Sequence, residues 1–123
     1  MNKISSKLHG VLDYAVGTLL IVSPWLFNFA TGGVAMWIPV SLGTAAILYS
    51  LVTNYELGLI RAIPFQTHLI IDAVSGTLLW ISPWVFGFSD VVFLPHLLIG
   101  VLEIIVVLIT NRKTSVDRPT TYS

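Results

Sequence analysis

The chain has 123 residues, of which 55% are hydrophobic and only 10% are charged, and its mean hydropathy is +0.88. A soluble domain carries about a quarter charged residues, so this composition predicts a protein surrounded by lipid. The formal net charge is zero, which argues against nucleic acid as a partner. The absence of cysteine excludes disulfides, thiolate catalysis and thiolate metal ligands.

An internal repeat organises the chain. The segment from His9 to Phe29 returns from His68 to Phe88 at one constant offset and without a gap. The positions of the first copy that are identical in the second are His9, Asp13, Gly17, Thr18, Leu19, Leu20, Ser23, Pro24, Trp25, Phe27 and Phe29. Such self-similarity marks a repeated structural unit. The first copy is not taken as a signal peptide, because its twin at 68–88 cannot be one.

Four apolar runs have lengths close to the 20 or so residues that cross a hydrocarbon core. They cover residues 8–29, 34–53, 68–88 and 91–110. The second and fourth runs also match at their ends, where Leu51-Val-Thr53-Asn54 corresponds to Leu108-Ile-Thr110-Asn111. Each repeat is therefore predicted to be a helical hairpin.

The predicted fold class is an all-α, four-helix transmembrane bundle made of two parallel-topology helical-hairpin repeats. It forms a single transmembrane domain over residues 1–123, with repeat 1 at 8–54, repeat 2 at 67–111 and a polar, frayed C-terminal tail at 112–123. Because each repeat holds an even number of spans, the two copies have the same orientation, and their pseudo-twofold axis is expected along the membrane normal.

The basic residues predict the orientation in the membrane. All of them fall on one side of the four runs, namely Lys3, Lys7, Arg61, Arg112, Lys113 and Arg118. The positive-inside rule then places both termini in the cytoplasm. An aromatic belt is expected at the opposite end, formed by Trp25, Phe27, Phe29, Trp37, Trp84, Phe86, Phe88 and Phe93.

Two copies of His-x3-Asp-x3-Gly-Thr-Leu-Leu-x2-Ser-Pro-Trp-x-Phe, each opening a pair of predicted membrane helices, resemble the SPW repeat family of small bacterial membrane proteins. The resemblance covers nearly the whole chain apart from the tail. It implies a multi-pass protein of the bacterial inner (plasma) membrane with two helices in each repeat. It carries over no catalytic residue and no cofactor.

The Ser-Pro-Trp motif has a mechanical explanation. Proline lacks an N–H, so each helix is expected to kink or break at Pro24 and Pro83, and the hydroxyls of Ser23 and Ser82 are candidates to bond the freed carbonyls. Tryptophan is expected to anchor the membrane interface, at Trp25 and Trp84. Points of close helix packing are predicted at Gly17, Gly43, Gly76 and Gly100, with Thr18, Thr77, Ser41 and Ala45.

A polar intramembrane cluster is the candidate site. Its predicted members are His9, Asp13, His68, Asp72 and Glu103. Histidine and aspartate four residues apart share one helix face, so these faces of the first and third helices are expected to meet near the pseudo-twofold axis. Intramembrane acids are costly and suggest a site for a proton, a cation or a small ligand. The structural alternative is that polar bonds across the helices simply lock the two hairpins together.

Metal binding is a narrower version of the same hypothesis. The five side chains could supply nitrogen and oxygen ligands of the kind that suit Zn, Mn or Fe. His-x3-Asp is a weak pattern by itself, so no metal and no cofactor are predicted.

The leading functional expectation is a non-enzymatic integral membrane protein. It would be a structural or interaction module whose helices are held together by the His and Asp residues of the polar cluster. Its expected partners are the lipid bilayer and a second copy of the chain or another membrane protein, without nucleic acid. The alternative is a small protein that binds or transports a proton, an ion or a small ligand through intramembrane carboxylates. No nucleophile elbow, catalytic triad or phosphate loop supports an enzyme.

Overall fold

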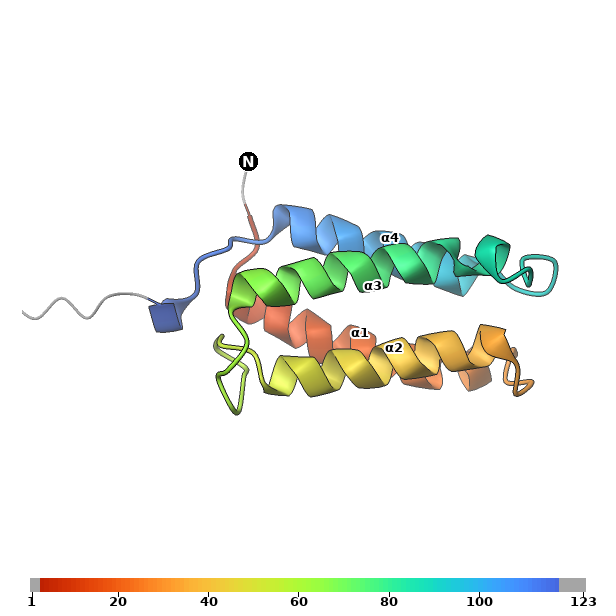
Figure 1. The fold of residues 1–123 in the computed structure, drawn as a ribbon, viewed down its shortest axis with the longest axis horizontal. Helices are drawn as coiled ribbons and strands as arrows, with labels where there is room; N and C mark the ends of the chain where they lie inside the picture. Colours follow the sequence, from red (N-terminus) through yellow and green to blue (C-terminus); the bar gives the residue numbers. More distant parts are fainter. Residues whose placement is uncertain (1–2, 118–123) are drawn as a thin grey trace, which may run out of the picture.

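Four helices make up the fold within residues 3–117, the part of the chain that the structure, a computed structural model, describes. They are α1 (Ser6–Leu26), α2 (Val34–Leu51), α3 (Phe65–Val85) and α4 (Leu94–Ile109), and a short 3-10 turn, η1 (Ser115–Asp117), follows. The helix α1 packs along α2 and α3 packs along α4, so each repeat is one hairpin (Figure 1). The predicted all-α bundle of two hairpin repeats is confirmed.

The loops divide the bundle into two unlike ends. Loops 27–33 and 86–93 lie together at one end, while the 52–64 connection and both described ends of the chain lie at the other (Figure 1). The helix α3 begins three residues before the start of its predicted run at residue 68. The helix α4 begins three residues after the start of its predicted run at residue 91. Pro64 sits directly before α3 and Pro95 lies in the first turn of α4, where a missing N–H costs nothing.

The helices α1 and α3 end in the same way. The second residue after each helix adopts a positive φ, 60° at Asn28 and 73° at Gly87. The amide of the following phenylalanine then donates to the proline carbonyl five residues earlier, at 2.8 Å after α1 and 2.7 Å after α3. This is a Schellman-type helix end. Glycine adopts its left-handed conformation freely, and asparagine tolerates it better than most residues, so both repeats make the same turn.

Both helices run through the proline of Ser-Pro-Trp without breaking and end two residues later. In α1, Pro24 leaves the carbonyl of Leu20 without its helical donor, and Ser23 Oγ donates to that oxygen at 2.8 Å. The equivalent bond in α3 runs from Ser82 to Leu79 and measures 2.7 Å. The predicted role of the serine hydroxyl is therefore confirmed in both repeats.

A third internal proline is satisfied from the other hairpin. Pro39 in α2 leaves the carbonyl of Ala35 without a donor, and His96 of α4 reaches across with Nε2 at 2.8 Å from that oxygen. The His96 ring is buried between Phe29 and Phe88, with ring centroids 5.1 and 5.0 Å away. This contact joins the two repeats at the end that carries the short loops.

Glycines let the helices of each hairpin approach closely. A Cβ added at Gly43 would lie 2.5 Å from the carbonyl oxygen of Gly17, and one added at Gly100 would lie 2.6 Å from that of Gly76. The predicted glycine crossings are therefore confirmed. The same prediction is wrong for Thr18, Thr77, Ser41 and Ala45, which are exposed. The two threonine hydroxyls instead bond carbonyls one turn earlier in their own helices.

The outer surface of the bundle is apolar on all four helices. Exposed apolar side chains include Val11 and Val22 of α1, Trp37 and Leu48 of α2, Ile70, Val74 and Leu78 of α3, and Leu98, Leu102, Ile105 and Leu108 of α4. Two helices, α2 and α3, are long and apolar enough to cross a membrane, whereas the sequence predicts four spans. The helix α4 is apolar but has 16 residues, and α1 carries Lys7, His9 and Asp13.

Backbone pairing at the polar end repeats the internal symmetry. Ile4, before α1, forms an isolated parallel bridge with Thr110 at the end of α4. Ile63, before α3, forms the same bridge with Thr53 at the end of α2. The residues before α1 thus pair with the end of α4, and the residues before α3 pair with the end of α2.

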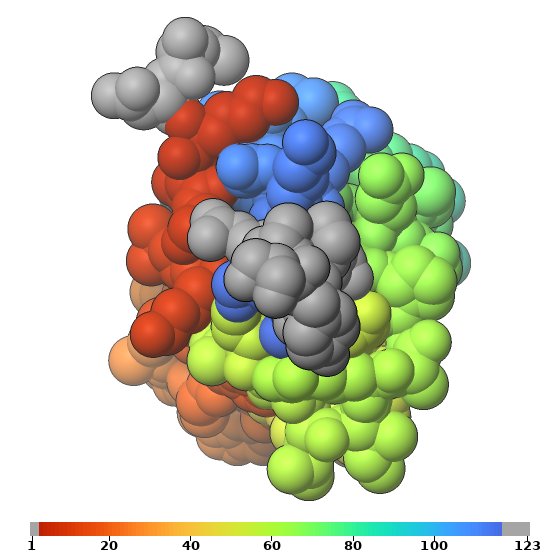
Figure 2. Space-filling view, turned by 90° about the vertical axis from the view of Figure 1, so that its left-hand side faces the viewer, coloured from red at the N-terminus to blue at the C-terminus, as the bar shows by residue number. Residues whose placement is uncertain are grey.

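The first part of the tail folds back onto this end and is not frayed. Glu56 accepts hydrogen bonds from Ser6 Oγ, at 2.7 and 2.6 Å, and from the amide of Ser115, at 3.1 Å. Thr114 is buried. Figure 2 shows the N-terminal segment (red), the C-terminal segment (blue) and the 52–64 connection (yellow-green) on the same face of the molecule. The rest of the predicted tail, residues 118–123, lies outside the described residues.

Candidate polar site between the two repeats

Four of the five predicted polar residues contact one another between the two hairpins. His9 and Asp13 extend from α1, and His68 and Asp72 extend from α3; we call these four the His/Asp cluster. His9 Nε2 lies 2.8 Å from Asp72 Oδ2 and 3.1 Å from Asp13 Oδ1. His68 Nε2 lies 2.9 Å from Asp13 Oδ2 and 3.1 Å from Asp72 Oδ2. Each imidazole therefore contacts the carboxylates of both repeats.

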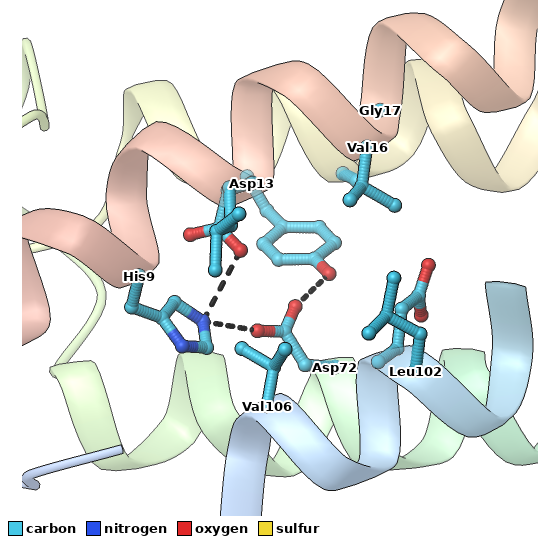
Figure 3. Close-up of a pocket in the computed structure, with 11 residues that line it drawn as sticks. His9, Asp13, Val16, Gly17, Asp72, Leu102 and Val106 are labelled. Atoms are coloured by element: carbon cyan, nitrogen blue, oxygen red, sulfur yellow. Dashed lines mark hydrogen bonds and ion pairs between the residues drawn. The ribbon is translucent and has the colours of Figure 1, made fainter. Parts of the chain in front are cut away.

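Burial makes these ion pairs unlike surface salt bridges. The side chains of His9 and His68 are 1% and 0% exposed, and those of Asp13 and Asp72 are 10% and 9% exposed. Figure 3 shows His9 and Asp13 pointing from α1 toward Asp72, with Leu102 and Val106 of α4 beside them. In such surroundings each charged group depends mainly on its partners, because little water reaches it.

A threonine from the other repeat orients each histidine. His9 Nδ1 lies 2.8 Å from Thr110 Oγ1, and His68 Nδ1 lies 2.8 Å from Thr53 Oγ1. Each threonine hydroxyl has one hydrogen, which it donates to the backbone carbonyl four residues earlier. Its oxygen therefore accepts, and Nδ1 of each ring is the donor. This assignment leaves Nε2 of both rings facing the carboxylates.

Tyrosine hydroxyls bind the aspartates. Tyr49 of α2 donates to Asp72 Oδ1, and Tyr55 of the 52–64 connection donates to Asp13 Oδ2 at 2.8 Å. Burial and the nearby Asp13 carboxylate raise the pKa of the Tyr55 hydroxyl, so Tyr55 remains a donor. These bonds break the symmetry of the repeats, because the position that matches Tyr49 holds Val106 in α4 and the one that matches Tyr55 holds Arg112 just after repeat 2.

The centre of the cluster requires positive charge. With Nδ1 as the donor on each ring, two Nε2 atoms and two carboxylates face one another. Acceptors stay buried together only when protons or a cation lie between them. One proton on each Nε2, or one divalent cation, balances the two carboxylate charges.

Glu103 lies beside the cluster and makes no hydrogen bond or ion pair with the residues that the structure describes. It lines a cavity of about 30 Å³ together with His9, Asp13, Tyr49 and Asp72. That volume is enough for a water molecule. The matching residue of repeat 1, Ala46, lines the same cavity, so the Glu103 carboxyl group has no counterpart in repeat 1. The structure thus groups four of the five predicted residues and places the fifth beside them.

The Ser-Pro-Trp residues occupy the other end of α1 and α3. Ser23, Pro24, Ser82 and Pro83 are buried, whereas Trp25 and Trp84 are 58% and 52% exposed. Phe29, placed in the aromatic belt by the sequence analysis, is 3% exposed and packs on His96. The motif therefore does not contribute to the His/Asp cluster.

Sequence reasoning missed the hydroxyl partners of the cluster. They are Tyr49, Thr53, Tyr55 and Thr110. A signal for the threonines was present, since Thr53 and Thr110 occupy matching places at the ends of the second helices. The tyrosines have no counterpart in repeat 2 and gave no such signal.

The fold and the site define an all-α protein of two hairpin repeats, with apolar outer faces and an ion-paired cluster between the repeats. A family model of the SPW repeat domain matches residues 7–110. The chain belongs to the SPW repeat family. This membership and the apolar helices indicate a membrane protein. Neither a search of curated proteins nor a search of solved structures finds a match.

Proposed function

We propose that the chain is a non-enzymatic, four-span protein of the bacterial inner membrane, in which the His/Asp cluster holds the two repeats together. The observation that carries this proposal is that polar and apolar side chains are distributed in the opposite way to those of a water-soluble protein. Apolar side chains cover the outside of all four helices, and the charged cluster lies inside. In water this arrangement would expose a large apolar surface, whereas in lipid the apolar faces meet acyl chains.

In this proposal the module acts through its outer faces, with a second copy of the chain or another membrane protein as its partner. Both termini and the 52–64 connection lie in the cytoplasm. The basic side chains Lys3, Lys7, Arg61, Arg112 and Lys113 support this orientation, because all of them belong to the end of the bundle that carries those segments. The opposite loops contain Asp90 and exposed aromatic residues.

Cysteine labelling tests the topology, and the natural absence of cysteine makes each introduced thiol unique. A membrane-impermeant maleimide applied to intact cells is expected to label Thr31→Cys and Asp90→Cys, both on exposed loop positions. Ala62→Cys, exposed at the other end, is expected to react only after the cells are permeabilised. Labelling of position 62 in intact cells, or protection of 31 and 90, would contradict the proposed orientation.

A second function, binding or transport of a proton or small cation, is favoured by Glu103. This carboxyl group and the cluster acids Asp13 and Asp72 line one small cavity. An intramembrane carboxyl without a partner is a candidate for ion or proton handling. Proton or cation flux into liposomes that is unchanged in the Asp13→Asn, Asp72→Asn double variant would count against this function.

A further inference from the structure

We propose that the His/Asp cluster is a binding site for one divalent first-row transition-metal ion such as Zn²⁺ or Fe²⁺. His9 Nε2, His68 Nε2 and one carboxylate oxygen from each of Asp13 and Asp72 would be the ligands. The inference goes beyond the role of a fastener between repeats. It also does not depend on how the helices are oriented in the membrane.

The spacing of the donor atoms fits a small metal ion. One ligand atom from each of the four residues lies within 4.8 Å of the other three. Zn–N and Zn–O bonds of roughly 2.1 Å put neighbouring ligands of a tetrahedral site roughly 3.4 Å apart. The four Nε2–carboxylate distances, from 2.8 to 3.1 Å, are slightly shorter than this. Small side-chain movements would therefore open the cluster around an ion.

The tautomers fit a metal site as well. A ligating histidine uses one nitrogen for the metal and donates the other N–H to a fixed oxygen, which sets the ring orientation. Thr110 and Thr53 supply those oxygens to Nδ1 of His9 and His68. The tyrosine bonds to Asp72 and Asp13 fix the carboxylates in the same way. Every ligand thus has a partner that holds it.

A second observation that points to a ligand comes from His68. Its side chain is fully buried, and its Nε2 has no hydrogen-bond partner among the residues that the structure describes. The two nearest carboxylate oxygens, at 2.9 and 3.1 Å, are close enough but lie outside hydrogen-bonding geometry. A buried nitrogen of this kind normally has a partner. A metal ion at the centre would supply one.

Charge and ligand type narrow the choice of ion. Two carboxylates and two neutral imidazoles bind a divalent cation with no net charge left in the apolar interior, which is the least costly outcome there. Imidazole nitrogen favours Zn, Fe, Ni or Cu, whereas Mg²⁺ and Ca²⁺ prefer sites built from oxygen alone. Mixed histidine and carboxylate ligation therefore points to a first-row transition ion and not to an alkaline-earth ion.

The test uses purified full-length protein in detergent micelles, stripped with a chelator and titrated with Co²⁺ as a visible probe. We expect one ion per chain, a ligand-field absorption spectrum of nitrogen and oxygen ligation, and displacement by Zn²⁺ but not by Mg²⁺. We also expect bound Zn²⁺ to raise the melting temperature of the wild-type chain, because it binds the folded state. A chain that binds no Co²⁺, or that releases it equally to Mg²⁺, would overturn the proposal and leave protons as the occupants.

Matched variants test which side chains bind the ion. His68→Gln and Asp72→Asn are expected to abolish stoichiometric Co²⁺ binding, and Thr53→Val is expected to weaken it roughly 10–100-fold through the lost orienting bond. His96→Gln, at a buried histidine outside the cluster, is the control and should bind like wild type. Retained binding in the folded ligand variants would reject the site. If those variants do not fold, the wild-type stoichiometry and thermal shift still decide.

Discussion

Replacing Asp72 with leucine is expected to lower the free energy of unfolding by about 3–5 kcal/mol, the usual cost of removing one partner from a buried ion pair. The Asp72 carboxylate contacts three side chains of the site, namely His9, His68 and Tyr49. Without it, two buried imidazoles share the single carboxylate of Asp13, and the Tyr49 hydroxyl loses its acceptor. Denaturant unfolding in micelles, followed by tryptophan fluorescence, measures the loss.

The matched control is Asp90→Leu. Asp90 is exposed on the loop between α3 and α4, so its replacement should change the unfolding free energy by no more than about 0.5 kcal/mol. A loss below about 1 kcal/mol for Asp72→Leu would mean that the cluster is solvated or unpaired, because exposed pairs contribute only that much.

Replacing His96 with leucine is expected to cost about 1–3 kcal/mol, because it leaves the buried carbonyl of Ala35 without a donor. Proline is the reason that this carbonyl is free, so the same substitution should cost less in a Pro39→Ala background. There the amide of residue 39 can complete the helical bond to Ala35. The packing of the ring on Phe29 and Phe88 is lost in both backgrounds and cancels from the comparison.

A double-mutant cycle of Pro39→Ala and His96→Leu measures this coupling directly. The four unfolding free energies should be non-additive, with the double variant more stable than the sum of the single losses predicts. Additive losses would mean that the cross-repeat bond from His96 to Ala35 contributes nothing and that His96 acts only through packing.

The sequence was sufficient for features that depend on local chemistry or on the repeat. The matched runs predict two hairpins, and the spacing of His9 and Asp13 puts them on one face that meets its twin on α3. The bond from Ser23 to the carbonyl freed by Pro24 is also a local consequence, because donor and acceptor lie within one helical turn. Such features need no knowledge of how the hairpins are placed.

Contacts between unrelated positions could not be predicted. Tyr49 reaches Asp72 from α2, Tyr55 reaches Asp13 from the 52–64 connection, and neither tyrosine has a counterpart in repeat 2, so the internal symmetry gives no indication of them. The bond from His96 to Ala35 depends on which face of α4 meets α2, which the pattern of apolar residues does not specify. Glu103 was assigned to the cluster by depth alone, and its position on α4 places it across a cavity instead.

The two repeats meet through the side chains at positions 13 and 72. Oxidative cross-linking of the Asp13→Cys, Asp72→Cys double variant in membranes tests it most directly, since the two native carboxylates contact the same imidazole nitrogens. We expect an intramolecular disulfide in this pair. We expect none in the Val11→Cys, Ile70→Cys double variant, because the parent side chains face outward and are 50% and 64% exposed. Failure of the first pair to form a disulfide, together with formation in the second, would contradict it.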